Sequence, residues 1–206
     1  MRIDSHADIL MPSRRHFLGG AIAGVVACAI PSAASAMVEN ARLLTLAQRE
    51  LARNQGQVWL RDRVGIVDFT LPSRDPRLFI VDMVAGSVKP FYVTHGRGSD
   101  PEHDGYLKSF SDVPDSLASS RGAYATRAYY EGKHGLSVRL QGLDSDNHTA
   151  EARAIVIHGA WYANPALLAE AGKLGRSEGC FALPEADLLE VVAKLGAGRL
   201  LFADRL

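Results

Sequence analysis

Apolar residues repeat at two different spacings along the chain, and the spacing changes near Gly56. Residues 38–54 place apolar side chains at the three- and four-residue intervals of one helix face. Downstream, short β-type runs alternate with glycine, proline and acidic turn residues. The runs predicted to form strands cover residues 64–70, 78–84, 89–94, 123–130, 136–140, 154–158 and 199–203. The pattern predicts an amphipathic helix followed by a mainly β domain.

A second helix is predicted after Pro184, because proline suits a helix start and acidic residues occupy the first turn. Many short strands with a few peripheral helices indicate a β-sandwich or partial barrel. Residues 96–121 form a long polar segment rich in glycine, serine and aspartate. A loop of this length in a compact domain is more often functional than accidental.

Residues 1–36 have the organisation of an export signal. Ser13–Leu18 contains two consecutive arginines followed by Phe and Leu, the twin-arginine pattern of bacterial export. The apolar run that follows is shorter than the roughly 20 residues needed to cross a bilayer. Ala34–Ala36 is an A-x-A cleavage pattern, so we expect cleavage after Ala36, export to the periplasm or beyond, and no stable membrane insertion afterwards. The alternative is an apolar N-terminal helix of a cytosolic protein.

The composition excludes several classes of protein. The 206 residues include 23 basic and 23 acidic side chains, and this balance argues against a nucleic-acid binder. Two cysteines exclude a disulfide-rich scaffold and an all-cysteine zinc site. Cys28 follows a lipobox-like sequence and would anchor the protein through a lipid; the alternative, which we favour, is removal with the signal. Cys180 is then the remaining thiol.

An unpaired cysteine in an exported protein indicates a reactive thiol or an intermolecular bridge, whereas a buried small hydrophobe is the alternative. Gly179 precedes Cys180 and permits a tight turn that could direct amide N–H groups at an oxyanion. A thiol nucleophile also needs a base. His158 ends an apolar run and is followed by Gly159, so it could meet Cys180 on a neighbouring turn. The alternative is a structural histidine.

His95 belongs to a second His-Gly pair, and it either lines the cleft opposite His158 or is a turn residue at a strand end. Four histidines fall in separate segments without ligand spacing, so we expect neither a metal nor a cofactor. They are His95, His103, His134 and His148. Aromatic residues could form a cleft wall against a sugar or peptide, or pack as core or rim residues. They are Tyr129, Tyr130, Trp161 and Tyr162.

Ile157–Gly159, a spacer of seventeen residues and Ser177–Cys180 together resemble the signature of the YkuD-like L,D-transpeptidase family of cell-wall enzymes. The resemblance to the murein branch of this family covers about residues 62–204. It continues through Thr94–Gly98, Phe110–Asp112, Ser119–Tyr124, Tyr130–Leu136 and Ala152–Ala160. It implies a YkuD-like partial barrel with a catalytic domain over residues 62–206, after a helical segment over residues 37–61.

The family implies Cys180 as the nucleophile, His158 as the general base and the Gly159 carbonyl as the group that orients the imidazole. Amides of Gly179 and Cys180 would form the oxyanion hole, and Ser177 would shape the turn. Substrate contacts are expected from Arg176, His95 and Tyr162. Glu178 stands where the family usually has histidine, and Ala182 where Asn or Arg is common. A nearby carboxylate raises a thiol pKa, so we expect Glu178 to point away or to bind a substrate amine.

The resemblance implies acyl transfer on peptidoglycan stem tetrapeptides, with a thioester on Cys180 and a 3-3 cross-link as product. Penicillin-binding enzymes use a Ser-x-x-Lys motif instead, which this sequence lacks. One alternative is an L,D-carboxypeptidase that transfers the same acyl group to water. Another is a non-catalytic wall-binding domain, because a fold alone does not guarantee a function.

Overall fold

The computed structural model describes residues 33–206. The twin-arginine pattern and Cys28 lie outside the described residues. The helices are α1 (Ala33–Arg53), α2 (Leu168–Ala171) and α3 (Glu185–Lys194), with 3₁₀ turns η1 (Arg97–Ser99), η2 (Trp161–Ala163) and η3 (Pro165–Leu167). The strands are β1 (Arg63–Asp68), β2 (Leu78–Asp82), β3 (Ser87–Phe91), β4 (Gly122–Gly132), β5 (Gly135–Gly142), β6 (Val156–Gly159), β7 (Phe181–Leu183) and β8 (Leu200–Asp204).

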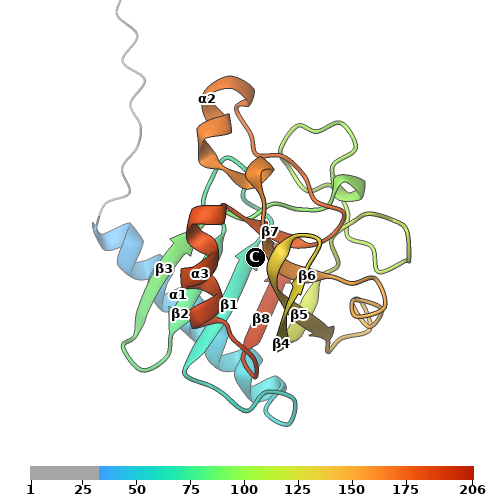
Figure 1. Ribbon diagram of the computed structural model, residues 1–206. Coiled ribbons are helices and arrows are strands. Elements are labelled where there is room, and N and C mark those ends of the chain that lie inside the picture. Colours follow the sequence, from blue (N-terminus) through green and yellow to red (C-terminus); the bar gives the residue numbers. More distant parts are fainter. Residues whose placement is uncertain (1–32) are drawn as a thin grey trace, which may run out of the picture. The chain divides into compact units, whose positions relative to one another are not determined.

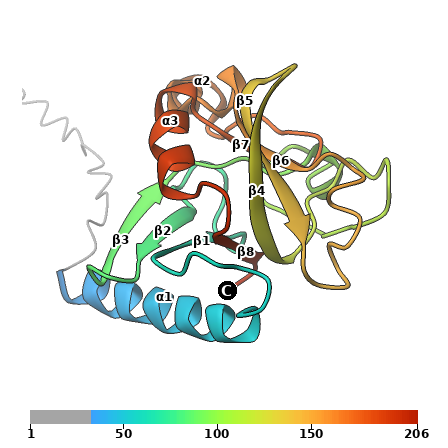
Figure 2. The ribbon, with the colours of Figure 1, turned by 60° about the horizontal axis from the view of Figure 1, so that its bottom comes forward.

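The strands form an eight-stranded sheet in the order β3-β2-β1-β8-β4-β5-β6-β7 (Figure 1). The pairs β1–β8 and β6–β7 are parallel, and the other neighbours are antiparallel. The part that holds β4 and β5 turns away from the part that holds β1 to β3, so the sheet curls (Figure 2). The prediction of a mainly β partial barrel with a few peripheral helices is therefore confirmed.

Helix α1 covers one face of the sheet below β1 to β3 (Figure 2). Leu43, Ala47 and Leu51 are buried in an apolar cluster with Val64 and Ile66 of β1. The helix begins at Ala33, five residues before the predicted start at residue 38. Alanines of the expected cleavage pattern are good helix formers, and here they lie in the first turns of α1. Helix and sheet belong to one compact unit over residues 32–206.

The other face of the sheet forms a second apolar core. Alternate residues of a strand point to opposite faces, so Val67 of β1 enters this core while Val64 and Ile66 face α1. Further members from other elements include Ile80, Tyr124, Leu140, Phe181, Leu183 and Val191. Burial of both faces explains why β1 has an almost continuous apolar run rather than a clean alternation.

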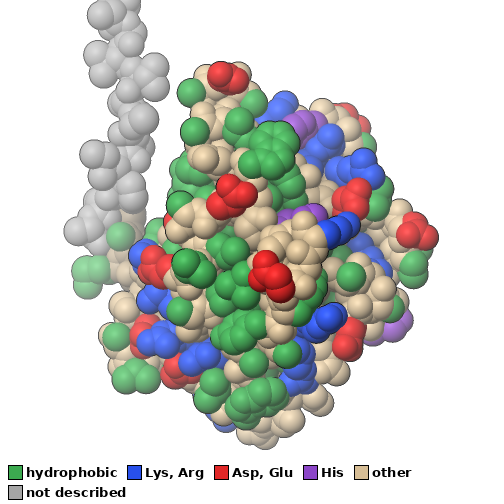
Figure 3. Space-filling view, in the orientation of Figure 1, with side chains coloured by type: hydrophobic (Ala, Val, Ile, Leu, Met, Phe, Trp, Pro, Cys, Tyr) green, Lys and Arg blue, Asp and Glu red, His purple; other side chains and the backbone are tan. Residues whose placement is uncertain are grey.

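Some apolar side chains stay exposed on the face that carries α3 and the β4–β5 hairpin (Figure 3). Leu189 of α3 is 72% exposed, and Tyr129 of β4 is 49% exposed. Scattered exposed apolar residues are normal on soluble proteins and need no functional explanation. Within residues 33–206, no helix has both the length and the apolar content that a bilayer crossing requires.

The edge of the sheet beside β6 and β7 brings together three of the predicted site residues, which are His158, Ser177 and Cys180. In the parallel ladder His158 lies opposite Ala182, and Cys180 directly precedes β7. Strand β7 has three residues, and it was not predicted. A bridge between Gly96 and Ser177 ties the 96–121 loop to the turn that carries the thiol. The long loop therefore lies next to that turn.

Candidate active site

A cavity of about 750 Å³ opens at this edge of the sheet, and both Cys180 and His158 line it. Four parts of the chain form its walls. They are the 96–121 loop, the β4–β5 hairpin, the segment that leads into β6, and the segment over residues 162–180. Pockets with a few polar groups converging on them are the usual places for ligands. The cavity is therefore the candidate active site.

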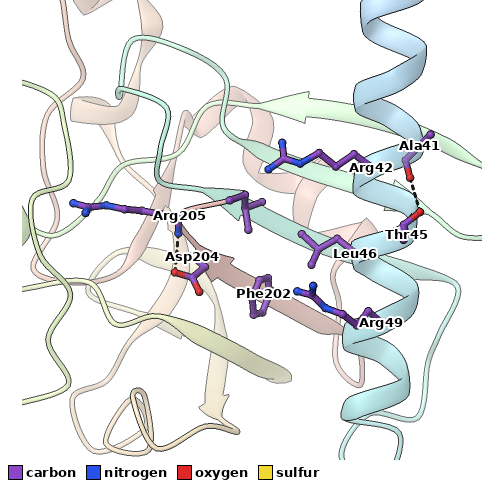
Figure 4. A pocket seen from close by; sticks show the side chains of 9 residues that line it. Ala41, Arg42, Thr45, Leu46, Arg49, Phe202, Asp204 and Arg205 are labelled. Atoms are coloured by element: carbon purple, nitrogen blue, oxygen red, sulfur yellow. Dashed lines mark hydrogen bonds between the residues drawn. The ribbon is translucent and has the colours of Figure 1, made fainter.

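A second cavity, of about 570 Å³, lies between α1 and the end of the chain (Figure 4). Leu46 and Phe202 line it, together with Arg42, Arg49 and Arg205. Arg42 pairs with Glu39 at 3.0 Å, and Arg205 donates to backbone carbonyls of the 96–121 loop. Among the described residues that line this second cavity there is no cysteine and no histidine, so we base the candidate active site on the first cavity.

The Cys180 thiol is held against the backbone that leads into β6. Its Sγ lies 3.6 Å from the carbonyl oxygen of Ala154. Burial raises the pKa of the Cys180 thiol above its ordinary value. A hydrogen bond from the Val156 amide and the charges of Lys133 and Arg153 oppose this shift without cancelling it. The thiol therefore keeps its proton at neutral pH.

His158 is the third residue of β6, and its side chain is almost fully buried. Its Nδ1 lies 2.9 Å from the carbonyl oxygen of Gly159. A carbonyl can only accept, so Nδ1 carries the hydrogen and Nε2 is left to accept a proton. Burial lowers the pKa of His158, and the bond to Gly159 only partly offsets it. The imidazole is thus a neutral base with a fixed tautomer.

The turn that carries the thiol is closed by Ser177. The Ser177 hydroxyl donates to the carbonyl of Cys180 at 2.7 Å and accepts from the Gly179 amide at 3.2 Å. Gly179 has φ +113°, a conformation that side-chain-bearing residues rarely adopt. The Gly179 amide therefore already has an acceptor within the protein, and a role in an oxyanion hole would require it to change partner.

Glu178 faces Arg97 of the 96–121 loop and pairs with it at 2.9 Å. Both side chains are more than half exposed, so this ion pair lies at the mouth of the cavity. Arg176 also lines the cavity and donates to the backbone carbonyls of Asp100 and Pro101. Tyr162 is a further wall residue, and burial raises its pKa to about 12, which keeps its hydroxyl protonated.

His95 does not reach the cavity, which corrects the expectation that it lines the cleft opposite His158. Its side chain is fully buried between the Arg77 guanidinium, 2.7 Å from Nδ1, and Asp100, 3.1 Å from Nε2. The backbone of His95 still supports the site, because its carbonyl accepts the amide of Ser177 at 2.9 Å. Within residues 33–206, no group of three or more His, Cys, Asp or Glu side chains is arranged to hold a metal.

Two site residues were missed by the sequence analysis. His134, in the turn between β4 and β5, stacks on His158 with ring centroids 4.2 Å apart and planes 20° apart. The side chain of Arg153 is only 5% exposed and donates to the carbonyls of Ser111 and Ala118, so it ties the 96–121 loop to the wall of the cavity. Both residues lie in segments that resemble the L,D-transpeptidases, and this was the available signal.

The sequence model of the L,D-transpeptidase catalytic domain matches residues 36–203. No match is found among curated protein sequences. Similar solved structures include an L,D-transpeptidase from Mycobacterium smegmatis (TM-score 0.41, 13% identity). Others are an L,D-transpeptidase from Mycobacterium tuberculosis H37Rv (TM-score 0.42, 14% identity) and L,D-transpeptidase 3 from Mycobacterium tuberculosis with a faropenem-derived adduct (TM-score 0.45, 14% identity).

Each of these three alignments covers 69% of this chain and 58%, 57% and 60% of the respective solved chains. The chain thus spans less than two thirds of the length of the structures it matches. The family match begins inside α1 and includes all the residues that line the cavity. Because that match extends over most of the chain, the protein belongs to the family of L,D-transpeptidase catalytic domains.

Proposed function

We propose that this protein is an L,D-transpeptidase that uses Cys180 as its nucleophile and His158 as its general base on peptidoglycan stem tetrapeptides. One observation carries the proposal. Cys180 and His158 line the same cavity, and the Gly159 carbonyl fixes the imidazole with Nε2 as the proton acceptor. A nucleophile and a base oriented by a third group are the parts that thiol acyl transfer requires.

The first half-reaction forms a thioester. The Cys180 sulfur attacks the carbonyl carbon of the third stem residue, and His158 Nε2 takes the thiol proton as the C–S bond forms. The Cys180 amide stabilises the oxyanion of the tetrahedral intermediate, and the Gly179 amide joins it once it leaves the Ser177 hydroxyl. That intermediate collapses as the C–N bond to the terminal D-Ala breaks. The leaving amine takes the proton from the imidazolium of His158.

The second half-reaction returns the enzyme to its starting state. An amine of another stem attacks the thioester carbonyl, and His158 Nε2 accepts its proton. The C–S bond then breaks, the sulfur regains a proton from His158, and the product is a 3-3 cross-link. Water in place of the amine would give a tripeptide, which is the carboxypeptidase outcome. The chemistry on the protein is the same for both acceptors.

Export is part of the same proposal, because the substrate lies outside the cytosol. The twin-arginine pattern at Ser13–Leu18 and the A-x-A pattern at Ala34–Ala36 support it. Replacement of both Arg14 and Arg15 by lysine should retain the unprocessed chain in the cytosol. Fractionation of cells that express the two forms measures this, and equal export of both would contradict the twin-arginine assignment.

The activity is tested by incubating the protein with a disaccharide tetrapeptide and following the products by mass spectrometry. A cross-linked dimer with released D-Ala supports transpeptidation, and a tripeptide alone supports hydrolysis. With the full 206-residue chain, Cys180→Ala should abolish both, whereas Cys28→Ala is the matched cysteine control and should retain activity. No product from the folded protein would support the wall-binding alternative. Equal turnover by Cys180→Ala and the unaltered protein would overturn the nucleophile assignment.

A further inference from the structure

The β4–β5 hairpin places an imidazole directly on the proposed base. His134 and His158 stack with 4.2 Å between ring centroids and 20° between their planes. The pairing of β5 with β6 sets this contact, because Ser137 lies opposite His158 in the ladder. The reaction steps proposed above do not use His134, so its position needs a separate explanation.

The stack restricts the movement of the His158 ring and its contact with solvent. Its side chain is 1% exposed, whereas His134 lies on the solvent side and is itself exposed. The Gly159 carbonyl holds one edge of the His158 ring at Nδ1, and His134 covers one face. An edge contact and a face contact together fix the plane of the ring. Nε2 is then the nitrogen that remains available on the cavity side.

Burial and the nearby cations lower the pKa of both imidazoles. Burial disfavours a proton on either ring, Lys133 in the same turn as His134 does the same, and a charge on His134 further disfavours a proton on His158. The pKa of each imidazole therefore lies below the ordinary histidine value, while Glu178 opposes this at His134 and the Gly159 carbonyl opposes it at His158. Other titratable or charged groups that line the cavity are Arg97, Asp115, Tyr130, Arg153, Tyr162, Arg176 and Cys180.

We propose that His134 is a positioning residue for the same acyl transfer, an inference that rests on the proposed function. Its ring shields His158 from water and holds the His158 imidazole in one orientation without a proton on Nε2. That nitrogen is then ready to take the thiol proton. The aromatic face of His134 performs this task, rather than a proton that His134 itself transfers. The proposal therefore separates the ring of His134 from its ability to titrate.

Three variants test this. His134→Ala removes the ring, His134→Phe keeps an aromatic face without a titrating group, and Glu131→Ala is a control on an exposed residue of the same hairpin. His134→Ala should lower kcat for the tetrapeptide by roughly three- to tenfold, the range of an aromatic contact, with little change in KM. His134→Phe and Glu131→Ala should retain most of the activity.

The pH profile supplies a readout that a purely structural role would not move. Without the shielding ring, His158 regains water, so its pKa should rise toward the ordinary value. The acidic limb of the kcat profile should shift to higher pH in His134→Ala and stay in place in His134→Phe. Nuclear magnetic resonance titration of the His158 Cε1–H measures the same shift without any turnover.

The outcomes separate this inference from the proposed function. Wild-type rates and an unmoved His158 titration in a folded His134→Ala would overturn the role of His134 and leave the Cys180 assignment intact. Equal loss of activity in His134→Phe and His134→Ala would show that the imidazole nitrogens of His134 are needed rather than its aromatic face, which also contradicts the proposal. If the unaltered protein forms no product, the titration of His158 still decides whether His134 shields it.

Discussion

Gly179 occupies a position that a methyl group should disrupt. Its φ of +113° lies outside the small left-handed region that side-chain-bearing residues can enter. A Cβ built at Gly179 would lie 2.7 Å from the carbonyl oxygen of Ala118 and 2.9 Å from Cδ1 of Ile155. It would also lie 3.1 Å from a guanidinium nitrogen of Arg153. Gly179→Ala should therefore displace the turn that carries the thiol.

The expected loss in the free energy of unfolding of Gly179→Ala has two parts, one from the backbone conformation and one from the contact with Ala118. A positive φ costs an alanine about 1–2 kcal/mol, and more outside the left-handed region. The contact with Ala118 adds to this, because a backbone carbonyl cannot rotate away and it also accepts from Arg153. Loss of a buried hydrogen bond of this kind costs about 1–3 kcal/mol. We therefore expect Gly179→Ala to lower the free energy of unfolding by about 3 kcal/mol.

Gly172 provides the matched control. Its φ is +66°, within the left-handed region, and no atom lies within 4 Å of an added Cβ. Gly172→Ala therefore carries the conformational cost alone, about 1 kcal/mol. Urea denaturation of both variants measures the difference in stability. The rate of Cys180 alkylation and the yield of cross-linked dimer measure whether the thiol has moved.

Gly172→Ala should alkylate and turn over like the unaltered protein, whereas Gly179→Ala should lose most of its activity even where it is fully folded. Equal destabilisation by the two substitutions would refute the argument from the Ala118 contact. Full activity of a folded Gly179→Ala would show that the nucleophile does not depend on this turn.

Three further predictions concern charges in and behind the site. Glu178→Gln removes a carboxylate that raises the Cys180 pKa, so alkylation below that pKa should accelerate about two- to threefold; an unchanged rate would refute the coupling. Arg77→Met leaves the Val93 and Leu71 carbonyls without their donor, and urea denaturation should show a loss of about 3–5 kcal/mol; a loss below about 1 kcal/mol would contradict this. Burial and Arg77 lower the folded-state pKa of His95 to about 3. Between that pKa and about 6.5, the unfolded chain binds a proton that the folded protein does not, so stability falls as pH falls through this window. Denaturation at several pH values should show a shallower loss for His95→Asn, and equal slopes would contradict this role of His95.

Local patterns in the sequence predicted most of the elements, because each longer strand carries its own apolar run. Strand β7 was missed since three residues are too few to show a pattern, and its parallel pairing with β6 depends on the whole chain. The parallel pairing of β1 with β8 joins residues that are far apart in the sequence. Local periodicity contains no information about such partners.

The site residues, too, could be predicted only as far as local sequence patterns reach. His95 and His158 both precede a glycine at the end of an apolar run, and sequence alone treats them alike. The difference is that Arg77 and Asp100 enclose the side chain of His95, whereas His158 lines the cavity. The sequence assigned no role to His134, because its stack on His158 depends on the geometry of the hairpin. Contacts between distant segments therefore decided which histidine belongs to the site.

The side chains that line the cavity carry an excess of positive charge, although the whole chain has no net charge. This excess suits the proposed reaction, because its intermediate is an oxyanion. Cationic Arg97, Lys133, Arg153 and Arg176 line the cavity, against carboxylates at Asp115 and Glu178. Burial opposes both a thiolate at Cys180 and an imidazolium at His158, whereas Lys133 lowers the pKa of both groups. Burial thus keeps both groups uncharged, while the charge of Lys133 favours a thiolate over an imidazolium. In the proposed mechanism, the neutral thiol loses its proton to the neutral base as it attacks, and these cations would stabilise the oxyanion of the intermediate.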